Sequence, residues 1–123
     1  MKLRTTDSIR ITERDLREQV RDLCKLFGWE FLFTWTSIHS PKGMLDLLLI
    51  NKEQKRVIFA ELKTERGKLT PEQQETFDNL VACGQEVYVW RPQDIEGIAD
   101  ILRYSREKVE ELLKQETAGA LIE

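Results

Sequence analysis

One stretch of the chain, VIFAELKTERGKLTPEQQETFDNLVACGQEVYVW at residues 57–90, decides the fold. It opens inside an apolar pattern that predicts a strand over residues 56–63, and it closes with a short strand over residues 87–90. Between the two, Thr70 before a proline is typical of a helix start, and we expect the helix to run to about Cys83. A strand, a helix and a strand in this order favour a right-handed crossover connection.

The segments before this stretch add a helix and two strands to it. Thr12 begins a capping box, and apolar residues then recur at helical spacing until Gly28, so the pattern predicts a first helix. Residues 29–36 are aromatic and β-branched, which is typical of a strand. The almost wholly apolar residues 46–50 predict another strand, covered on both faces, that pairs with residues 56–63 as an antiparallel hairpin.

Two further helices are expected after the last strand, the first around residues 95–102 and the second at about residues 105–116. Strands and helices that alternate in this way predict an α/β fold with a central mixed β-sheet flanked by helices. At 123 residues the chain fits a single domain, residues 1–123, with one hydrophobic core.

The composition limits the possible classes of function. Hydrophobic residues make up 41% of the chain and charged residues 33%, which is typical of a folded globular protein. No apolar stretch approaches the roughly 20 residues that cross a bilayer, and the N-terminus lacks a signal-peptide pattern. We therefore expect a cytoplasmic protein, in the host cytoplasm if the source is viral, and not a secreted one. The net charge of −3 gives no overall signal for nucleic acid, although a local basic rim can still contact phosphates.

The cysteines do not indicate a zinc site. Cys24 and Cys83 are far apart without CxxC spacing, and His39 is the only histidine in the sequence that could complete a site with them. Each cysteine has apolar neighbours in a helical pattern, so we expect both side chains in the core.

A cluster of charges is expected at one end of the sheet. Because side chains alternate along a strand, Glu61 and Lys63 share a face, with their Cα atoms roughly 7 Å apart. Asp46 begins the neighbouring strand and lies as far from the hairpin turn as Glu61 does, so the two carboxylates should meet. Carboxylates that close repel unless a cation lies between them, and hard oxygen ligands suit Mg²⁺ or Mn²⁺. Such an ion with Lys63 beside it would favour phosphodiester hydrolysis.

These three residues also have a purely structural explanation. Glu61 and Lys63 are compatible with an ordinary ion pair at a solvated strand end. Asp46 is compatible with a polar residue that merely begins a strand. The spacing alone leaves both interpretations open.

The helices supply two more candidates with the same ambiguity. Gln73 fits a capping box with Thr70, yet it also lies on the side of its helix that faces the sheet. Glu13 lies at the edge of the buried stripe of the first helix, from which it could reach the site. Its alternative role is that of a first-turn acid favoured by the helix dipole.

At these residues the chain resembles the VRR-Nuc family of the PD-(D/E)xK nuclease superfamily. Three segments carry the resemblance in the order that the family shows: TERDLREQVRDLCKLFGW, LDLLLI and VIFAELKTERGKLTPEQQETFDNLVACGQEVYVWRP. The E-x-K element followed by RGKLTPEQ is its most specific part. The resemblance implies a restriction-endonuclease-like core over about residues 12–102, with the helix at about residues 105–116 as an addition.

The resemblance also implies a catalytic site drawn from the first helix, the hairpin and the second helix: Glu13, Asp46, Glu61, Lys63 and Gln73. Asp46 and Glu61 are the implied metal ligands, with the backbone carbonyl of Leu62 as a further one. Glu13 would contact the ion directly or through water. Lys63 is the implied catalytic lysine and Gln73 the helix glutamine that braces the site. The chain departs from the family at Leu45, where proline usually precedes the aspartate, and this change affects the backbone rather than a ligand.

A metal-dependent, structure-selective DNA endonuclease is the function that this resemblance implies. Stand-alone members of the family resemble Holliday-junction resolvases that act as dimers, so we expect branched DNA as the substrate and a homodimer. Mg²⁺ is the expected cofactor, with Mn²⁺ as the alternative. Three loop cations are candidates for phosphate contacts: Lys42, Arg66 and Lys68. The alternative function is a non-catalytic DNA-binding or interaction module of the same fold in a replication or repair assembly.

Overall fold

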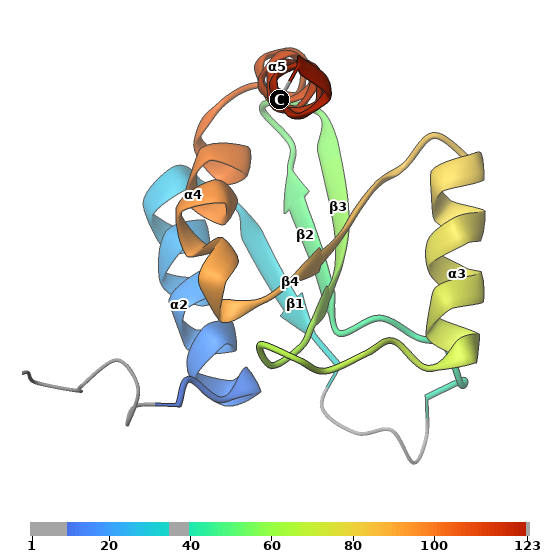
Figure 1. The fold of residues 1–123 in the computed structure, drawn as a ribbon. Helices are drawn as coiled ribbons and strands as arrows, with labels where there is room; N and C mark the ends of the chain where they lie inside the picture. Colours follow the sequence, from blue (N-terminus) through green and yellow to red (C-terminus); the bar gives the residue numbers. More distant parts are fainter. Residues whose placement is uncertain (1–9, 35–39, 123) are drawn as a thin grey trace, which may run out of the picture.

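The computed structural model describes residues 10–34 and 40–122, with side chains described as far as residue 115. Its elements follow one another in the order shown in Figure 1. They are α2 (Glu13–Phe27), β1 (Glu30–Phe33), β2 (Leu47–Asn51), β3 (Arg56–Leu62), α3 (Pro71–Ala82), β4 (Glu86–Trp90), the 3₁₀ helix η1 (Pro92–Asp94), α4 (Ile95–Arg103) and α5 (Arg106–Ile122).

The strands form a mixed four-stranded sheet in the order β1-β2-β3-β4. β2 pairs antiparallel with both β1 and β3, whereas β3 and β4 are parallel. Helices α2 and α4 cover one face of this sheet, α3 covers the other, and α5 lies beyond one end of the strands (Figure 1). The predicted α/β class, the hairpin and the crossover through a helix are therefore confirmed.

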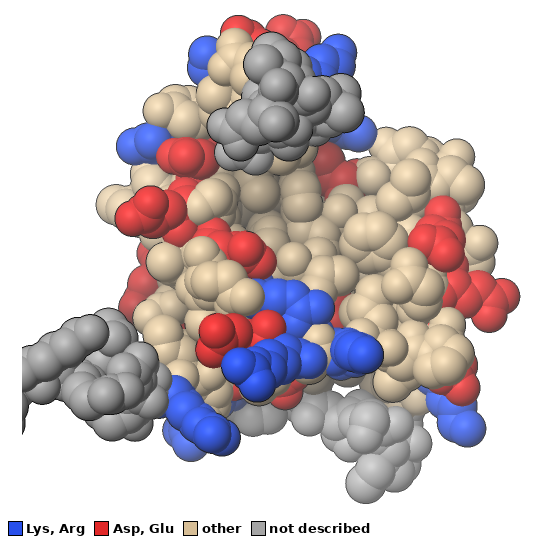
Figure 2. Space-filling model, in the orientation of Figure 1, with Lys and Arg blue, Asp and Glu red and all other residues tan. Residues whose placement is uncertain are grey.

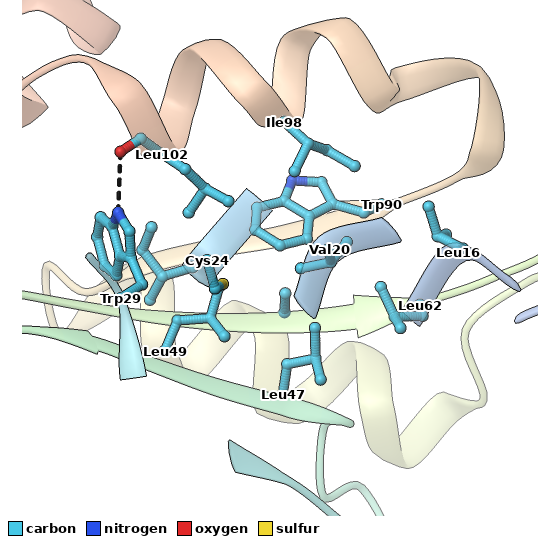
Figure 3. Packing of buried hydrophobic residues seen from close by; sticks show 12 residues of the cluster. Leu16, Val20, Cys24, Trp29, Leu47, Leu49, Leu62, Trp90, Ile98 and Leu102 are labelled. Carbon is cyan, nitrogen blue, oxygen red and sulfur yellow. Dashed lines mark hydrogen bonds between the residues drawn. The ribbon is translucent and has the colours of Figure 1, made fainter. Parts of the chain in front are cut away.

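The hydrophobic core lies between the sheet and the pair α2 and α4 (Figure 3). Alternate residues of β2 and β3 point into it, because side chains alternate along a strand. The helices add apolar residues at helical spacing, and the fully buried members include Leu16, Val20, Leu49, Ile58 and Ile98. Trp29 closes one side of the core, and its indole Nε1 donates a hydrogen bond of 2.8 Å to the carbonyl oxygen of Leu102.

The opposite face of the sheet is covered less completely. Helix α3 contributes no fully buried residue, and Leu48 and Ile50 of β2 are only half-buried beneath it. The prediction that β2 is covered on both faces was therefore only partly right. Because α3 covers this face of the sheet incompletely, a pocket opens at one end of the face, and the site lies beside that pocket.

Both capped helices begin where the sequence predicts. Thr12 caps α2 in a capping box with Asp15, and Thr70 caps α3 in a second capping box with Gln73. Helix α2 ends at Gly28, whose φ of 82° lies in the left-handed region that favours glycine. These caps satisfy backbone N–H groups that a helix start would otherwise leave without partners.

Several boundaries and one burial prediction were wrong. β1 is shorter than expected: Trp29 precedes it, Thr34 follows it, and residues 35 and 36 lie outside the described residues. Helix α5 continues to Ile122 rather than ending near residue 116. Cys24 is buried as expected, but Cys83 is exposed at the end of α3, because that helix presents its last turn to solvent.

A buried ion pair that the sequence did not indicate joins the start of β3 to the start of β4. Arg56 and Glu86 are 5% and 7% exposed, and two hydrogen bonds of 2.8 Å connect the guanidinium to the carboxylate. The guanidinium also donates to the carbonyl oxygens of Ile101 and Tyr104 and lies over the ring of Trp29, with Cζ 5.0 Å from the ring centroid. This network ties the end of α4 to the sheet.

None of the helices in the described part of the chain combines the length and apolar character needed to span a membrane.

Candidate active site

The hairpin brings the two predicted acids together. In its antiparallel register Leu47 lies opposite Ala60, so Asp46 and Glu61 are neighbours at the end of β3. The Asp46 backbone N–H donates a hydrogen bond of 3.0 Å to Glu61 Oε1, and the Leu62 backbone N–H donates one of 3.0 Å to Asp46 Oδ2. Each carboxylate is therefore held by the backbone of the other strand.

Lys63 and Gln73 meet at the second oxygen of Glu61. Lys63 Nζ lies 3.1 Å from Glu61 Oε2, and Gln73 Nε2 donates a hydrogen bond of 2.9 Å to the same oxygen. The Gln73 side chain also accepts a hydrogen bond of 3.0 Å from the Thr70 backbone N–H at Oε1. Both interpretations of Gln73 therefore hold at once: one end of its amide caps α3, and the other end fixes Glu61.

Burial makes the Glu61 carboxyl a weaker acid than an exposed glutamate. The residue is 2% exposed, and burial is the main cause that raises the pKa of its carboxyl to about 7. The nearby Asp46 carboxylate raises the pKa further, whereas Lys63 and the Asp46 backbone N–H oppose the rise. The two carboxylates of Asp46 and Glu61 outnumber the single Lys63 ammonium, so a negative charge remains where little water reaches it. A bound cation would offset that charge.

A pocket of about 420 Å³ opens beside this cluster, between the loop before β2 and the first turn of α3. Asp46 and Gln73 line it together with Lys42, Gly43 and Thr70. Gly43 has a φ of 90°, and a Cβ built there would lie 2.6 Å from a carbonyl oxygen of α3. Only glycine lets this loop approach the helix so closely, and the approach shapes the wall of the pocket.

The donor set fits a hard divalent cation. Asp46 and Glu61 supply carboxylate oxygens, and among the described residues no hydrogen bond reaches Asp46 Oδ1, which leaves that oxygen available. The backbone carbonyl of Leu62 belongs to the residue between Glu61 and Lys63. Within residues 10–34 and 40–115, no group of three or more His, Cys, Asp or Glu side chains is arranged to hold a metal ion. Further ligands would have to come from the backbone and from water.

Among the predicted catalytic residues, Glu13 is the one that the structure does not join to the others. It is exposed in the first turn of α2, and no hydrogen bond or ion pair links it to the described members of the cluster. Its contact with an ion, directly or through water, stays a prediction. The other four, Asp46, Glu61, Lys63 and Gln73, form one hydrogen-bonded group.

The predicted phosphate contacts lie at the edge of the site. Lys42, Arg66 and Lys68 are all exposed, the first beside the pocket and the other two in the loop between β3 and α3. Figure 2 shows Lys and Arg side chains gathered at the lower end of the visible face, where this loop crosses between α4 and α3 in Figure 1.

Arg91 is a contributor to this region that the sequence did not reveal. It directly follows β4, and its Nη1 donates hydrogen bonds to the carbonyl oxygens of Thr64, at 2.9 Å, and Gly67. These bonds fix the loop that follows Lys63. Its position in the sequence could have indicated this role, because an arginine that ends the strand parallel to β3 lies at the same end of the sheet as the two acids.

Comparison with known proteins identifies the fold and the family of the chain. The model of the VRR-NUC domain family matches residues 3–94. A solved structure described as a VRR_NUC domain superposes with a TM-score of 0.54 at 20% identity, covering 84% of this chain and 96% of that one, and it shows the same fold. The curated proteins gave no match. With three quarters of its length matched by the family model, the chain belongs to the VRR-NUC domain family, a nuclease-type family.

Proposed function

We propose that this protein is a metal-dependent endonuclease that hydrolyses phosphodiester bonds in DNA. One observation carries the proposal: Asp46 and Glu61 are fixed side by side at one sheet end, with the Lys63 ammonium 3.1 Å from Glu61. Such an arrangement combines acidic oxygen ligands with a cation that can act on a phosphate. The membership of a nuclease-type family supports the same reaction class.

Mg²⁺, with Mn²⁺ as an alternative, is the cofactor that the donor set favours. Asp46, Glu61 and the backbone carbonyl of Leu62 would hold it, and Glu13 would contribute through water. When bound, an ion of this kind lowers the pKa of a coordinated water and offsets charge on a phosphate. The burial that raises the pKa of Glu61, together with the nearby Asp46 carboxylate, makes its ionised form costly, and a bound cation would offset that cost.

The side chains of the protein carry the remaining tasks. Lys63 positions the nucleophilic water and stabilises negative charge on the phosphate oxygens in the transition state. Gln73 holds Glu61 in one orientation, so little reorganisation is needed when substrate binds. The loop cations Lys42 and Arg66, with Lys68, would contact the DNA backbone on either side of the scissile phosphate.

Branched DNA is the proposed substrate, and a homodimer is the proposed active form. A two-fold dimer would present two equivalent active sites to a two-fold symmetric junction, which matches the stand-alone nucleases that the chain resembles. Light scattering at micromolar concentration measures the mass directly. A monomer under those conditions would count against paired cleavage.

The test of the reaction is cleavage of a labelled four-way junction with Mg²⁺ or Mn²⁺. Wild type should cut, whereas Asp46→Asn and Lys63→Met should lose at least about 100-fold in rate, the usual scale for removal of one electrostatic catalytic group. Lys52→Gln, in the turn at the far end of the hairpin, is the matched control and should cut normally. Wild-type rates in both site variants would reject the assignment.

A thermal-shift series separates metal binding from catalysis. A magnesium concentration ten times Kd should stabilise wild type by about 1.4 kcal/mol, and Asp46→Asn should abolish this gain. The Asn side chain can still accept the Leu62 N–H, so the metal-free variant should stay folded. Binding of DNA without cleavage, and without any response to Mg²⁺ or Mn²⁺, would instead identify a non-catalytic module.

A further inference from the structure

Arg91, the residue that follows β4, has a firmly held backbone. Its φ of −124° and ψ of 162° continue the extended conformation of the strand by one residue. Its N–H donates a hydrogen bond of 2.9 Å to Asp94 Oδ2, and its carbonyl oxygen accepts one of 2.9 Å from the Asp94 N–H. Pro92, whose ring restricts its own φ, comes directly after it. The Arg91 side chain therefore starts from a fixed point at the sheet end that holds Lys63.

The parallel register places Arg91 beside Lys63. Leu62 is paired with Trp90, and the Lys63 N–H donates a hydrogen bond of 3.0 Å to the Trp90 carbonyl oxygen. Paired residues of neighbouring strands share a face of the sheet, and the face alternates at each step along the strand. Leu62 and Trp90 both belong to the core cluster. The next pair, Lys63 and Arg91, therefore leaves the sheet on its other face.

The Arg91 guanidinium closes the turn that follows Lys63, which we call the Thr64–Gly67 turn. Arg91 Nη1 donates to the carbonyl oxygens at both ends of this turn, to that of Thr64 at 2.9 Å and to that of Gly67. The bond within the turn, from the Gly67 N–H to the Thr64 carbonyl oxygen, is 3.3 Å long, beyond the usual range for N–H···O. Because a charged donor makes stronger hydrogen bonds than a neutral one, the guanidinium contributes more to closure of the turn than that bond does. Figure 1 shows the loop after β3 next to the point where the chain leaves β4.

The closed turn packs against the stem of Lys63. A Cβ built on Gly67 would lie 3.5 Å from both Cβ and Cδ of Lys63, which is ordinary van der Waals contact, and 3.1 Å from Thr64 Oγ1. The Gly67 backbone thus covers the methylene chain of the lysine at close range. The Lys63 side chain is only 14% exposed, although residues 64–66 of the turn are exposed.

Lys63 needs such support, because a lysine side chain is flexible. Four methylene groups join its ammonium to the backbone, and the ammonium is a point charge without a preferred plane. The contact of Nζ with Glu61 Oε2, at 3.1 Å, fixes only the tip of the side chain. That contact would also weaken in the working site, since the Glu61 carboxylate is a proposed ligand of a cation. Packing of the stem would then keep the ammonium directed at the phosphate.

We propose that Arg91 is a positioning residue for Lys63: by closing the Thr64–Gly67 turn it holds the lysine stem and so aims the ammonium at the reacting phosphate. The inference rests on the proposed function, because that function assigns the catalytic task to Lys63. Arg91 does not need to touch DNA in this role. Its substitution should therefore slow the chemical step more than it weakens DNA binding.

The first test measures the accessibility of Lys63 without metal or DNA. Limiting acetic anhydride at pH 8 acetylates lysine amines, and mass spectrometry gives the reaction of Lys63 relative to that of exposed Lys52 in the same molecule. Arg91→Met should raise this ratio about 5-fold or more, because loss of the two hydrogen bonds favours local opening of the turn. Arg103→Met makes the same exchange at the end of α4, where the arginine side chain is 50% exposed, and it should keep the wild-type ratio.

A second variant and a folding control accompany this test. Arg91→Gln introduces a shorter, polar side chain, and it should raise the ratio in the same way. Slow reaction of buried Cys24 with a thiol reagent shows that each variant is folded. A wild-type ratio in either folded Arg91 variant would overturn the proposal. An equal rise in Arg103→Met would show an effect of charge alone and would overturn it as well.

The second test measures cleavage of a labelled four-way junction at saturating protein with Mg²⁺. Arg91→Met should cut about 10-fold more slowly, because a small misplacement of a reacting group can cost up to about 100-fold. Its affinity for the junction in EDTA should fall less than its cutting rate. Lys63→Met/Arg91→Met should cut no more slowly than Lys63→Met, since the two changes remove one function. The same further loss in both backgrounds would show that Arg91 acts independently of Lys63 and would refute the proposal.

The two proposals fail in different ways in these experiments. A wild type that never cuts DNA would refute the nuclease, whereas raised Lys63 reactivity in the Arg91 variants would still show that Arg91 holds the lysine. A wild type that cuts, with Arg91 variants unchanged in Lys63 reactivity and in cutting rate, would refute the positioning role alone. Slower cutting without a change in Lys63 reactivity would identify a direct substrate contact and would also overturn that role.

Discussion

Gln73 offers a sharp test of the site, because two hydrogen bonds from one amide have separate consequences. Its Oε1 accepts from Thr70 and caps α3, while its Nε2 donates to Glu61. Thr70→Ala removes the hydroxyl that accepts from the Gln73 backbone N–H and leaves both bonds of the Gln73 amide. Gln73→Ala removes both bonds of the amide and keeps the Thr70 hydroxyl cap. Gln73→Glu keeps an acceptor for the cap and places a second carboxylate against Glu61.

The magnitudes follow from these contacts. Loss of an N-cap side chain costs about 1 kcal/mol, so Thr70→Ala should cost about that much. A hydrogen bond to a charged group contributes about 1.5–3 kcal/mol, so Gln73→Ala should cost about 3 kcal/mol in total. In Gln73→Glu two like charges 4 Å apart repel by about 4 kcal/mol at an effective dielectric of 20, before the side chains relax. Gln73→Glu should therefore be at least as unstable as Gln73→Ala.

Urea denaturation followed by circular dichroism at pH 9, well above the raised pKa of Glu61, and without divalent ions, gives the free energies of unfolding of wild type and the three variants. The expected order of stability is wild type, Thr70→Ala, Gln73→Ala and then Gln73→Glu. If Gln73→Glu were as stable as wild type, the amide would not contact Glu61 in solution and the bracing of the site would be wrong. If Gln73→Ala matched Thr70→Ala, Gln73 would be a helix cap and nothing more.

Three further predictions concern other parts of the molecule. Arg56→Met should destabilise the protein by about 3–5 kcal/mol in urea, because it leaves Glu86 buried without its partner, and Arg56→Met/Glu86→Leu should recover most of that loss. Ellman's reagent at pH 8 should modify Cys83 quickly and Cys24 only after unfolding, because burial raises the pKa of the Cys24 thiol to about 12; two fast thiols in the folded protein would contradict this. Gly43→Ala should lower stability by about 2 kcal/mol or more, measured by thermal unfolding, because its backbone is left-handed and its Cβ would meet α3; an unchanged midpoint would show that the loop can move aside.

Local signals explain what could be predicted from the sequence. Thr12 and Thr70 each begin a capping box at a fixed offset, and this chemistry depends on a few neighbouring residues only. The meeting of Asp46 and Glu61 followed from the hairpin, since an antiparallel pair with a short turn leaves few possible registers. The proximity was therefore predictable, although the reciprocal backbone hydrogen bonds were not.

Features that depend on packing between distant segments were missed. Arg56 and Glu86 are 30 positions apart and lie on parallel strands, whose relative register no sequence period reveals. Arg91 meets the loop after β3 for the same reason. Cys83 was placed wrongly because its apolar neighbours in α3 do not all face the sheet: Val81 is 54% exposed. Periodicity identified the helix but not how much of it the sheet covers.

The acidic cluster has a consequence for the order in which the molecule assembles. Its hydrogen-bonded pairs are only 15, 16 and 12 positions apart along the chain, so their loops close at small entropic cost. Contacts of such short range favour early formation during folding, before α2 and α4 are packed against the opposite face. The four hydrogen-bonded residues of the site thus lie within residues 46–73, so the cluster can form before the helices that cover the opposite face of the sheet are packed.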